Sequence, residues 1–482
     1  MIKKHLRSLS ATAFQIIFNQ FSGLLFFVLL AIYLSQGLFG DLNWAVAVSY
    51  TITTMFTFGF DHVLVRRIAA GSDARITTGT YLSHTIIISL FLFIFLILHR
   101  ILFPGFHSAH GLLFMVLCGG LFSFMSFPFR QFANGLQKFW HLAFMNVFGN
   151  VLRVLGMLLL IVLGKVTAPN LGWLFLTSGF MELLIAILLA RHITGNLIRP
   201  VFRKKVYVLL FNEALPQLGV VLLESSLARL DWILMGLIST SIFTADYSFA
   251  YKAFDSSRIP LLIVAPVLLP KMARLYGSGK ALDRHSIDEL DKLWRLESVI
   301  AVVIPLILST CWVDAINLVT NDKYGETTQF VYIILAIALP MLYVSNFFWT
   351  IAFSQKRIKD TFRISAAVTV TNLVLNLLLI PYFNAIGAAI ACTCSLLVQM
   401  VLYRVIVKEP RLHTPMSDFI KTTLIGAVIA LSIHYIDVHW LFKIPLALSA
   451  YIIVIYTTGM LNSVLPERLL FSRAQQRRNN DH

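Results

Sequence analysis

The chain has 482 residues, of which 58% are hydrophobic and only 13% charged, and its mean hydropathy of +0.80 excludes an ordinary soluble globular protein. The net charge of +16 is spread over many short segments. Because it forms no single basic stripe with interleaved aromatic residues, it argues against a nucleic-acid partner. The four cysteines lie in apolar segments without disulfide or metal-ligand spacing, so we expect no metal and no cofactor.

Apolar segments of about 20 residues follow one another along almost the whole chain, and a helix of that length crosses the roughly 30 Å hydrocarbon layer of a bilayer. The sequence therefore predicts an all-α polytopic membrane protein with about fourteen transmembrane helices. In chain order they lie near residues 11–34, 42–60, 79–98, 111–131, 141–163, 171–190, 209–239, 242–270, 296–319, 328–353, 362–380, 385–407, 418–436 and 441–460.

Lys and Arg fall almost entirely in every second gap between these segments. Since basic loops are retained on the cytoplasmic side, this alternation places both termini in the cytoplasm. Residues 465–482 are then a basic cytoplasmic tail. The first apolar run is too long for a signal peptide and lacks a small-residue cleavage site, so it is predicted to be an uncleaved first helix.

All the loops are short, and no Walker A, HExxH or GxSxG motif occurs in the chain. The loops therefore leave no room for a soluble catalytic domain. The sequence favours a transporter over an enzyme.

Two parts of the chain resemble each other. Residues 153–160, Arg-Val-Leu-Gly-Met-Leu-Leu-Leu, align with residues 373–380, Leu-Val-Leu-Asn-Leu-Leu-Leu-Ile, and a short outer loop follows both. Parallel repeats of this kind build a central cavity between two lobes. We predict an N-lobe of six helices (1–190), a cytoplasmic linker (191–208), a C-lobe of six helices (209–407) and two additional helices (408–464).

Polar residues recur at helical spacing inside several of the segments. These stripes comprise Thr12, Gln15, Asn19 and Ser22 on the first helix, Asn146, Asn150 and Arg153 on the fifth, and Ser365, Thr369, Asn372 and Asn376 on the eleventh. Helix packing is one interpretation, since small and polar residues often bond membrane helices together. For Arg153 a functional role is favoured, because an arginine in mid-span costs about 2.5–3.5 kcal/mol on insertion scales.

The predicted seventh helix carries Glu213, Glu224 and Asp231 at separations close to whole turns, so the three acids share one face. Arg229 points roughly the opposite way. On the eighth helix Asp255 is within reach of both Lys252 and Arg258. These charges either order the two helices as ion pairs or line a cavity.

Several short motifs carry a family resemblance. Asn372 to Asn376, followed by Ile-Pro-Tyr-Phe-Asn-Ala-Ile-Gly-Ala-Ala from residue 380, resembles the N-x-x-x-N…IP…G-x-x-GAA stretch of polysaccharide exporters. Residues 230–236 and 266–270 are similar to that family's seventh and eighth helices. The chain thus resembles the O-antigen and exopolysaccharide flippases of the MATE-like superfamily. The first helix lacks the Arg-Asp pattern usual in the lipid II flippase branch, which counts against that branch.

The resemblance implies a flippase of the bacterial cytoplasmic (inner) membrane. It would move a polyprenyl-diphosphate-linked oligosaccharide from the inner to the outer leaflet by alternating access, for O-antigen, capsule or exopolysaccharide synthesis. The alternatives are a MATE-type cation-coupled drug antiporter, a lipid II-type flippase and a non-transporting scaffold.

A diphosphate in a partly dehydrated cavity needs cationic partners, and the in-span cations Arg153, Arg229, Lys252 and Arg258 are the expected headgroup contacts. The sugars would bond to the polar stripes, at Gln15, Asn19, Asn146, Asn150, Asn372 and Asn376. The acids Glu213, Glu224, Asp231 and Asp255 are candidates for H⁺ or Na⁺ coupling. Besides the lipid-linked oligosaccharide, membrane lipids and a polysaccharide-synthesis complex are the expected partners.

Overall fold

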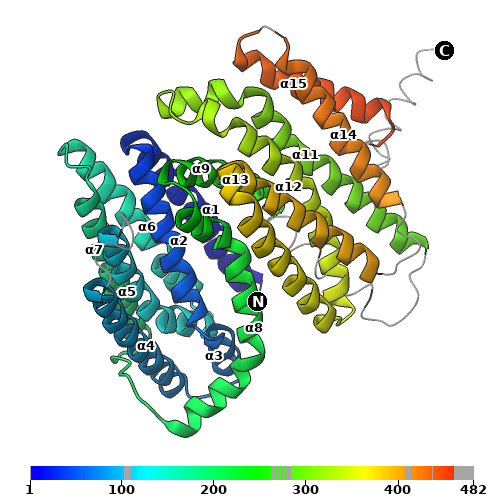
Figure 1. Cartoon of the computed structure of the whole chain (residues 1–482). Coiled ribbons are helices and arrows are strands. Elements are labelled where there is room, and N and C mark those ends of the chain that lie inside the picture. Colours follow the sequence, from blue (N-terminus) through cyan, green and yellow to red (C-terminus); the bar gives the residue numbers. More distant parts are fainter. Residues whose placement is uncertain are drawn as a thin grey trace. The chain divides into compact units, whose positions relative to one another are not determined.

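The computed structural model describes residues 2–102, 110–261, 284–407, 414–436 and 438–460, with the single positions 268, 272 and 276. Helices are the only regular secondary structure among these residues, which contain no strand. The helices are shown in Figure 1. They are α1 (Ile2–Tyr33), α2 (Gln36–Met55), α3 (Phe60–Ala69), α4 (Ala74–Leu102), α5 (His110–Gly135), α6 (Phe139–Val162), α7 (Ala168–Thr194), α8 (Lys204–Ile238), α9 (Ser241–Ser257), α11 (Arg284–Thr320), α12 (Gly325–Ser354), α13 (Ile358–Ile406), α14 (Thr414–His434) and α15 (Trp440–Thr457).

Helix α13 is two membrane segments rather than one. As a straight helix its 49 residues would extend about 74 Å, more than twice the roughly 30 Å of hydrocarbon. Asn384, three residues after Pro381, leaves the helical conformation with φ of 49°. The Arg357 Nη1 donates to the Ile406 carbonyl at 2.6 Å, so the two ends of α13 meet. The two halves therefore run antiparallel, as the predicted segments 362–380 and 385–407 require.

Eleven of the described helices are long and apolar enough to cross a membrane, with α13 counted once. α2 and α9 are not among them, and the predicted segment 242–270 continues beyond the described residues. The polytopic, all-α class is confirmed. The number of fourteen spans stays a prediction.

The chain divides into two compact units, residues 1–245 (unit 1) and 246–482 (unit 2). Within unit 1, α8 packs against α2 and α3, α5 against α7, and α1 along α6. Within unit 2, α11 packs against α12, α14 and α15. The predicted lobe boundaries stay predictions, and the predicted tail 465–482 lies outside the described residues.

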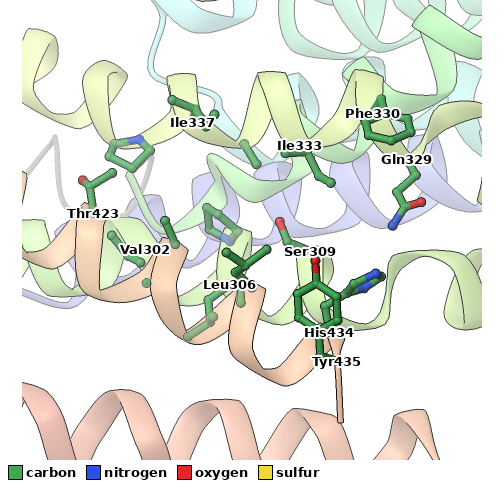
Figure 2. A pocket seen from close by; sticks show the side chains of 17 residues that line it. Val302, Leu306, Ser309, Gln329, Phe330, Ile333, Ile337, Thr423, His434 and Tyr435 are labelled. Carbon is green, nitrogen blue, oxygen red and sulfur yellow. The ribbon is translucent and has the colours of Figure 1, made fainter. Parts of the chain in front are cut away.

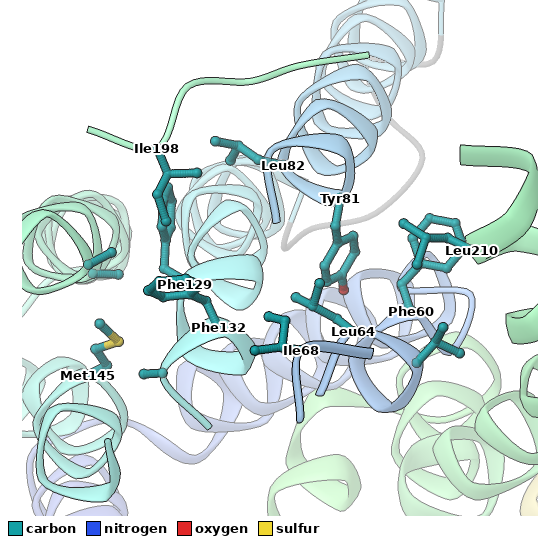
Figure 3. Close-up of a cluster of buried hydrophobic side chains, with 14 of the residues drawn as sticks. Phe60, Leu64, Ile68, Tyr81, Leu82, Phe129, Phe132, Met145, Ile198 and Leu210 are labelled. Carbon is teal, nitrogen blue, oxygen red and sulfur yellow. The ribbon is translucent and has the colours of Figure 1, made fainter. Parts of the chain in front are cut away.

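A buried aromatic cluster holds α3 in unit 1 (Figure 3). Phe60, Leu64 and Ile68 recur every four residues and so form one apolar face of this short helix. That face packs on Tyr81 of α4 and Phe129 of α5, which are both almost fully buried. The opposite face of α3 is thereby left for polar and charged side chains.

Glycines bring α5 and α7 into backbone contact. A Cβ at Gly179 would overlap the Gly119 carbonyl, and one at Gly119 would overlap the Phe175 carbonyl. Small residues are the usual means by which membrane helices approach closely, because van der Waals packing then replaces the missing hydrophobic drive.

We expect Gly179→Ala to destabilise the protein by about 1–3 kcal/mol, the usual cost of overpacking a close contact. The thermal midpoint of the detergent-solubilised chain measures this. Gly37→Ala is the control, because that helical glycine faces open space. Equal midpoints for the two variants would contradict the close approach of α5 and α7.

Candidate functional site

A buried charged cluster joins three helices of unit 1. Glu182 of α7 lies between Arg130 of α5, at 3.2 Å, and Arg153 of α6, at 3.8 Å. The Glu182 side chain is only 7% exposed, and those of Arg130 and Arg153 are 15% and 22% exposed. We call these three residues the arginine cluster.

Small residues make room for the Glu182 carboxyl group. A Cβ at Gly149 of α6 would overlap that carboxyl, so glycine is needed where α6 faces it. The Ser123 hydroxyl donates to Glu182. On α7 itself, one turn before Glu182, the Ser178 hydroxyl accepts a hydrogen bond of 3.3 Å from the Arg153 Nε. Hydroxyl groups therefore hold both residues, Ser123 of α5 for Glu182 and Ser178 of α7 for Arg153.

The polar stripes predicted on the first and fifth helices meet. The Arg153 Nη1 donates to the Asn150 Oδ1 at 3.2 Å, and the Asn150 Nδ2 donates to the Asn19 Oδ1 of α1 at 3.1 Å. Gln15 and Asn146 lie half-buried on the same two helices. The network thus extends the arginine cluster to α1.

The arginine cluster has more positive charge and more donors than its carboxylate uses. Two guanidinium groups flank the single carboxylate of Glu182. The Arg130 Nη2 is the atom paired with Glu182 at 3.2 Å, whereas the Arg130 Nε is buried and makes no hydrogen bond in the part of the chain that is described. The guanidinium groups of Arg130 and Arg153 lie 5.5 Å and 5.4 Å from the ring centroids of Phe127 and Phe175. Arginines that are held against aromatic rings and keep an N–H group without an acceptor, as at the Arg130 Nε, are suited to bind an anion.

Asp61 adds a more distant negative charge from α3, which is not among the eleven candidate spans. The Tyr81 hydroxyl donates to it at 2.8 Å. Burial raises the pKa of the Asp61 carboxyl to about 6, although Tyr81, His62 and Arg130 each lower it. Just below neutral pH Asp61 therefore loses its charge, and Arg130 then has only Glu182 as a negative neighbour that these contacts identify.

Two of the predicted coupling acids are paired with arginines. The Glu213 carboxylate binds Arg66, at 2.6 Å, and Arg67, both of α3. Asp255 binds Arg258 at 3.0 Å, which confirms this half of the ion-pair set expected on the eighth helix. Of these five side chains, all except Arg67 are about a third or more exposed.

The remaining predicted charges have varied surroundings. Arg229 stacks on Trp232 and Tyr50, with its guanidinium carbon 4.7 Å and 5.7 Å from their ring centroids. Asp231 is buried and Lys252 is half-buried. The side chain of Glu224 lies outside the described residues.

In unit 2, Asn372 and Asn376 form a buried pair in the first half of α13. The Asn376 Nδ2 donates to the Asn372 Oδ1 at 3.0 Å and to the Asn372 carbonyl at 2.9 Å. Among the described residues, no three His, Cys, Asp or Glu side chains are placed to hold a metal ion.

Unit 2 also has a mostly apolar pocket between α11, α12 and α14, with a volume of about 410 Å³. Val302, Leu306, Ile333 and other apolar side chains line most of it (Figure 2). At one end Figure 2 shows a polar group, made of Ser309, Gln329, His434 and Tyr435. The sequence analysis did not identify this pocket.

Sequence reasoning also missed Arg130 and Glu182 as site residues. Arg130 comes at the end of an apolar segment, where basic residues are common, so its position did not indicate a site residue. Glu182 had a usable signal, because an acid in the middle of an apolar helix requires a partner. The identity of that partner is decided by helix packing.

Comparisons with known proteins agree with this architecture. The model of a family described as "Polysaccharide biosynthesis protein" matches residues 6–276, more than half of the chain. The capsular polysaccharide biosynthesis protein CapF of Staphylococcus aureus is 28% identical over 144 residues, covering 29% of this chain and 35% of that relative. The match therefore spans only about a third of the relative's length.

Solved structures show the same fold. The lipid II flippase MurJ in an inward closed conformation superposes with a TM-score of 0.74 at 16% identity, over 94% of this chain and 99% of that one. The Vibrio cholerae MATE transporter VcmN in its bent form has a TM-score of 0.54 at 14% identity, over 87% and 100%. At these identities the likeness concerns the fold alone, and it confirms the predicted MATE-like architecture.

We expect Glu182→Gln to lower the free energy of unfolding by about 3–5 kcal/mol, because it leaves two buried arginines without their shared counter-charge. Chemical or thermal unfolding of the purified protein in detergent measures the change. The matched control is Glu213→Gln, which also removes an acid from between two arginines but at an exposed place, where about 0–1 kcal/mol is expected. A loss at Glu213 as large as at Glu182 would refute this difference.

Proposed function

Because the chain belongs to the polysaccharide biosynthesis protein family, whose model matches residues 6–276, we propose that it is a flippase for a lipid-linked oligosaccharide. It moves a polyprenyl-diphosphate-linked oligosaccharide from the inner to the outer leaflet of the bacterial cytoplasmic membrane, by alternating access. Both termini are cytoplasmic in this proposal, and the product serves capsule, O-antigen or exopolysaccharide synthesis. The observation that carries the proposal is the arginine cluster of unit 1.

The chemistry of the headgroup explains why this cluster matters. A diphosphate keeps its negative charge inside the membrane only if cations replace its water. Arginine does so well, because its planar fork of N–H groups matches phosphate oxygens and stays charged when buried. The Arg130 Nε, which makes no hydrogen bond among the described residues, and the excess positive charge beside Glu182 offer both features. A pocket for organic cations would instead need an excess of acids.

The other predicted cations, Arg229, Lys252 and Arg258, are proposed as further headgroup contacts. Arg229 is already stacked between aromatic rings, an arrangement that keeps a guanidinium group in place with its edge available. The amides of Gln15, Asn19, Asn146, Asn150, Asn372 and Asn376 are proposed to bind the sugars. Glu213, Glu224, Asp231 and Asp255 remain the proposed sites for H⁺ or Na⁺ that the sequence suggested.

The apolar pocket of unit 2 is proposed to hold part of the polyprenyl chain. Its lining of aliphatic side chains from α11, α12 and α14 offers a hydrocarbon chain the same surroundings as lipid. Its polar end, with Gln329 and His434, is suited to the end of the chain that carries the diphosphate (Figure 2). The lipid tail would then be guided while the headgroup crosses.

We expect Arg153→Ala to reduce flipping about 10- to 100-fold, since a hydrogen bond to a charged group contributes about 1.5–3 kcal/mol. Membrane abundance should stay normal, because Glu182 keeps Arg130 as its partner. Arg153→Lys should recover part of the rate by restoring the charge. The assay follows a fluorescent polyprenyl-diphosphate-linked N-acetylglucosamine in proteoliposomes, by its accessibility to a membrane-impermeant quencher.

Arg363→Ala serves as the control, because this arginine is 77% exposed and pairs only weakly with Asp360. Its rate should equal that of the wild type. Uptake of ethidium by the same proteoliposomes, without movement of the lipid probe, would contradict the proposal and favour a drug antiporter.

A further inference from the structure

A second buried acid stands out in unit 2, and unlike Glu182 it has no hydrogen-bond or ion-pair partner among the described residues. Glu297 of α11 lies in the candidate span Ile287–Thr320 and is only 2% exposed. Both of its carboxyl oxygens are shielded from solvent, and neither takes part in a hydrogen bond in the described part of the chain. The sequence analysis did not single it out.

The groups around Glu297 do not neutralise it. From α12 it faces the phenol of Tyr343, which is hydrogen-bonded to the backbone of Leu261. From α14, Asp418 approaches this part of α11, where it is ion-paired with Arg295 at 3.0 Å. On α15 the Tyr451 hydroxyl donates to the Val299 carbonyl. Within the part of the chain that the structure describes, no cation forms an ion pair with Glu297.

A carboxylate in such a place has lost its hydrating water, and no hydrogen bond or ion pair among the described residues replaces it. A neutral carboxylic acid is tolerated far better, because burial penalises only the charged form strongly. Acids kept inside membrane segments are therefore functional candidates by default. We propose that Glu297 is a proton-binding site, through which a proton gradient drives the flippase. This inference rests on the proposed function.

The surrounding helices provide an element that can change shape. Pro305 of α11 lacks an N–H group, so the Ala301 carbonyl, one turn after Glu297, loses its usual helical partner. Pro340 of α12, about one turn before Tyr343, frees the Ala336 carbonyl in the same way. α11 also leaves the helical conformation at Cys311.

Proline-interrupted helices bend at such points. In the state described here Glu297 is dry and holds its proton. In a second bend that admits water, the carboxyl releases the proton as the hydrated ion and becomes a carboxylate. No other bond forms or breaks. Because the proton binds the two states with different affinity, a difference in pH across the membrane shifts the equilibrium between them.

The first test is infrared spectroscopy of the purified full-length protein, which shows a protonated carboxyl by its C=O stretching band. We expect such a band at neutral pH in the wild type and its loss in Glu297→Gln. Asp360→Asn is the control, because the Asp360 carboxylate is ion-paired with Arg357 at 3.0 Å, and this variant should leave the band unchanged. If the wild-type band is absent, or if it persists in Glu297→Gln, the proposal is wrong.

The second test measures coupling with the fluorescent polyprenyl-diphosphate-linked N-acetylglucosamine in proteoliposomes with and without a pH gradient. A gradient should accelerate flipping by the wild type, whereas Glu297→Gln should flip at one rate in both conditions. A merely structural role would lower the rate or the abundance but leave the gradient response. Glu297→Asp, which keeps a titratable group, should retain both the band and the response, and it replaces the amide variant if that one does not fold.

The outcomes separate the two proposals. If the band behaves as expected but Glu297→Gln still responds fully to the gradient, Glu297 is protonated yet does not couple, and the inference is refuted. If even the wild type moves no lipid probe under any condition, the proposed function fails, and the coupling inference fails with it. The infrared band then shows by itself whether Glu297 holds a proton.

Discussion

The hydrocarbon interior of a bilayer provides no water, so every polar group inside it has to find its partner within the protein. This constraint explains why helices are the only regular secondary structure in the described chain, since a helix satisfies its own backbone. It also explains where the helices break. α13 reverses at Asn384, close to one end of each half rather than in the middle of a span. Gly59, in the left-handed region with φ of 78°, turns the chain between α2 and α3.

The same constraint gives buried charges their meaning. Glu182 is stabilised by two guanidinium groups, a hydroxyl and the space that Gly149 leaves for it. Glu297 is buried to a similar extent, but among the described residues neither a guanidinium group nor a hydroxyl binds it. A buried ion that is well paired is expensive to disturb, whereas an unpaired acid is stable only when it is neutral. The two acids therefore point to different tasks, one in holding cations and the other in holding a proton.

Much of the architecture could be predicted from the sequence because it depends on local properties. The length of the apolar segments alone predicted a helix at each segment that the structure describes. It also predicted two separate segments in α13, which is assigned as one continuous helix across the kink at Asn384. Helical periodicity likewise put Asn150 and Arg153 on one face of α6. Such inferences need only the repeat of a single helix.

The pairing of side chains from different helices could not be read in this way. Arg130 and Glu182 are 52 positions apart, and their contact depends on how α5 and α7 pack through Gly119 and Gly179. Glu297 was missed because it lies at the beginning of its predicted segment, where an acid is normally hydrated. The structure shows α11 continuing before it to Arg284, so that position is buried by neighbouring helices.

These contacts suggest how the two units divide the work of moving a charged lipid. In unit 1, two guanidinium groups contact a single carboxylate, so their positive charge is greater in magnitude than its negative charge. This excess attracts an anion. Unit 2 holds a mostly apolar pocket and the buried acid Glu297, the proposed proton site, on helices interrupted by Pro305 and Pro340. A flippase needs both properties, because a site that binds a diphosphate tightly also resists its release. An energy source that acts on a separate, bendable element can overcome that resistance without weakening the binding site itself.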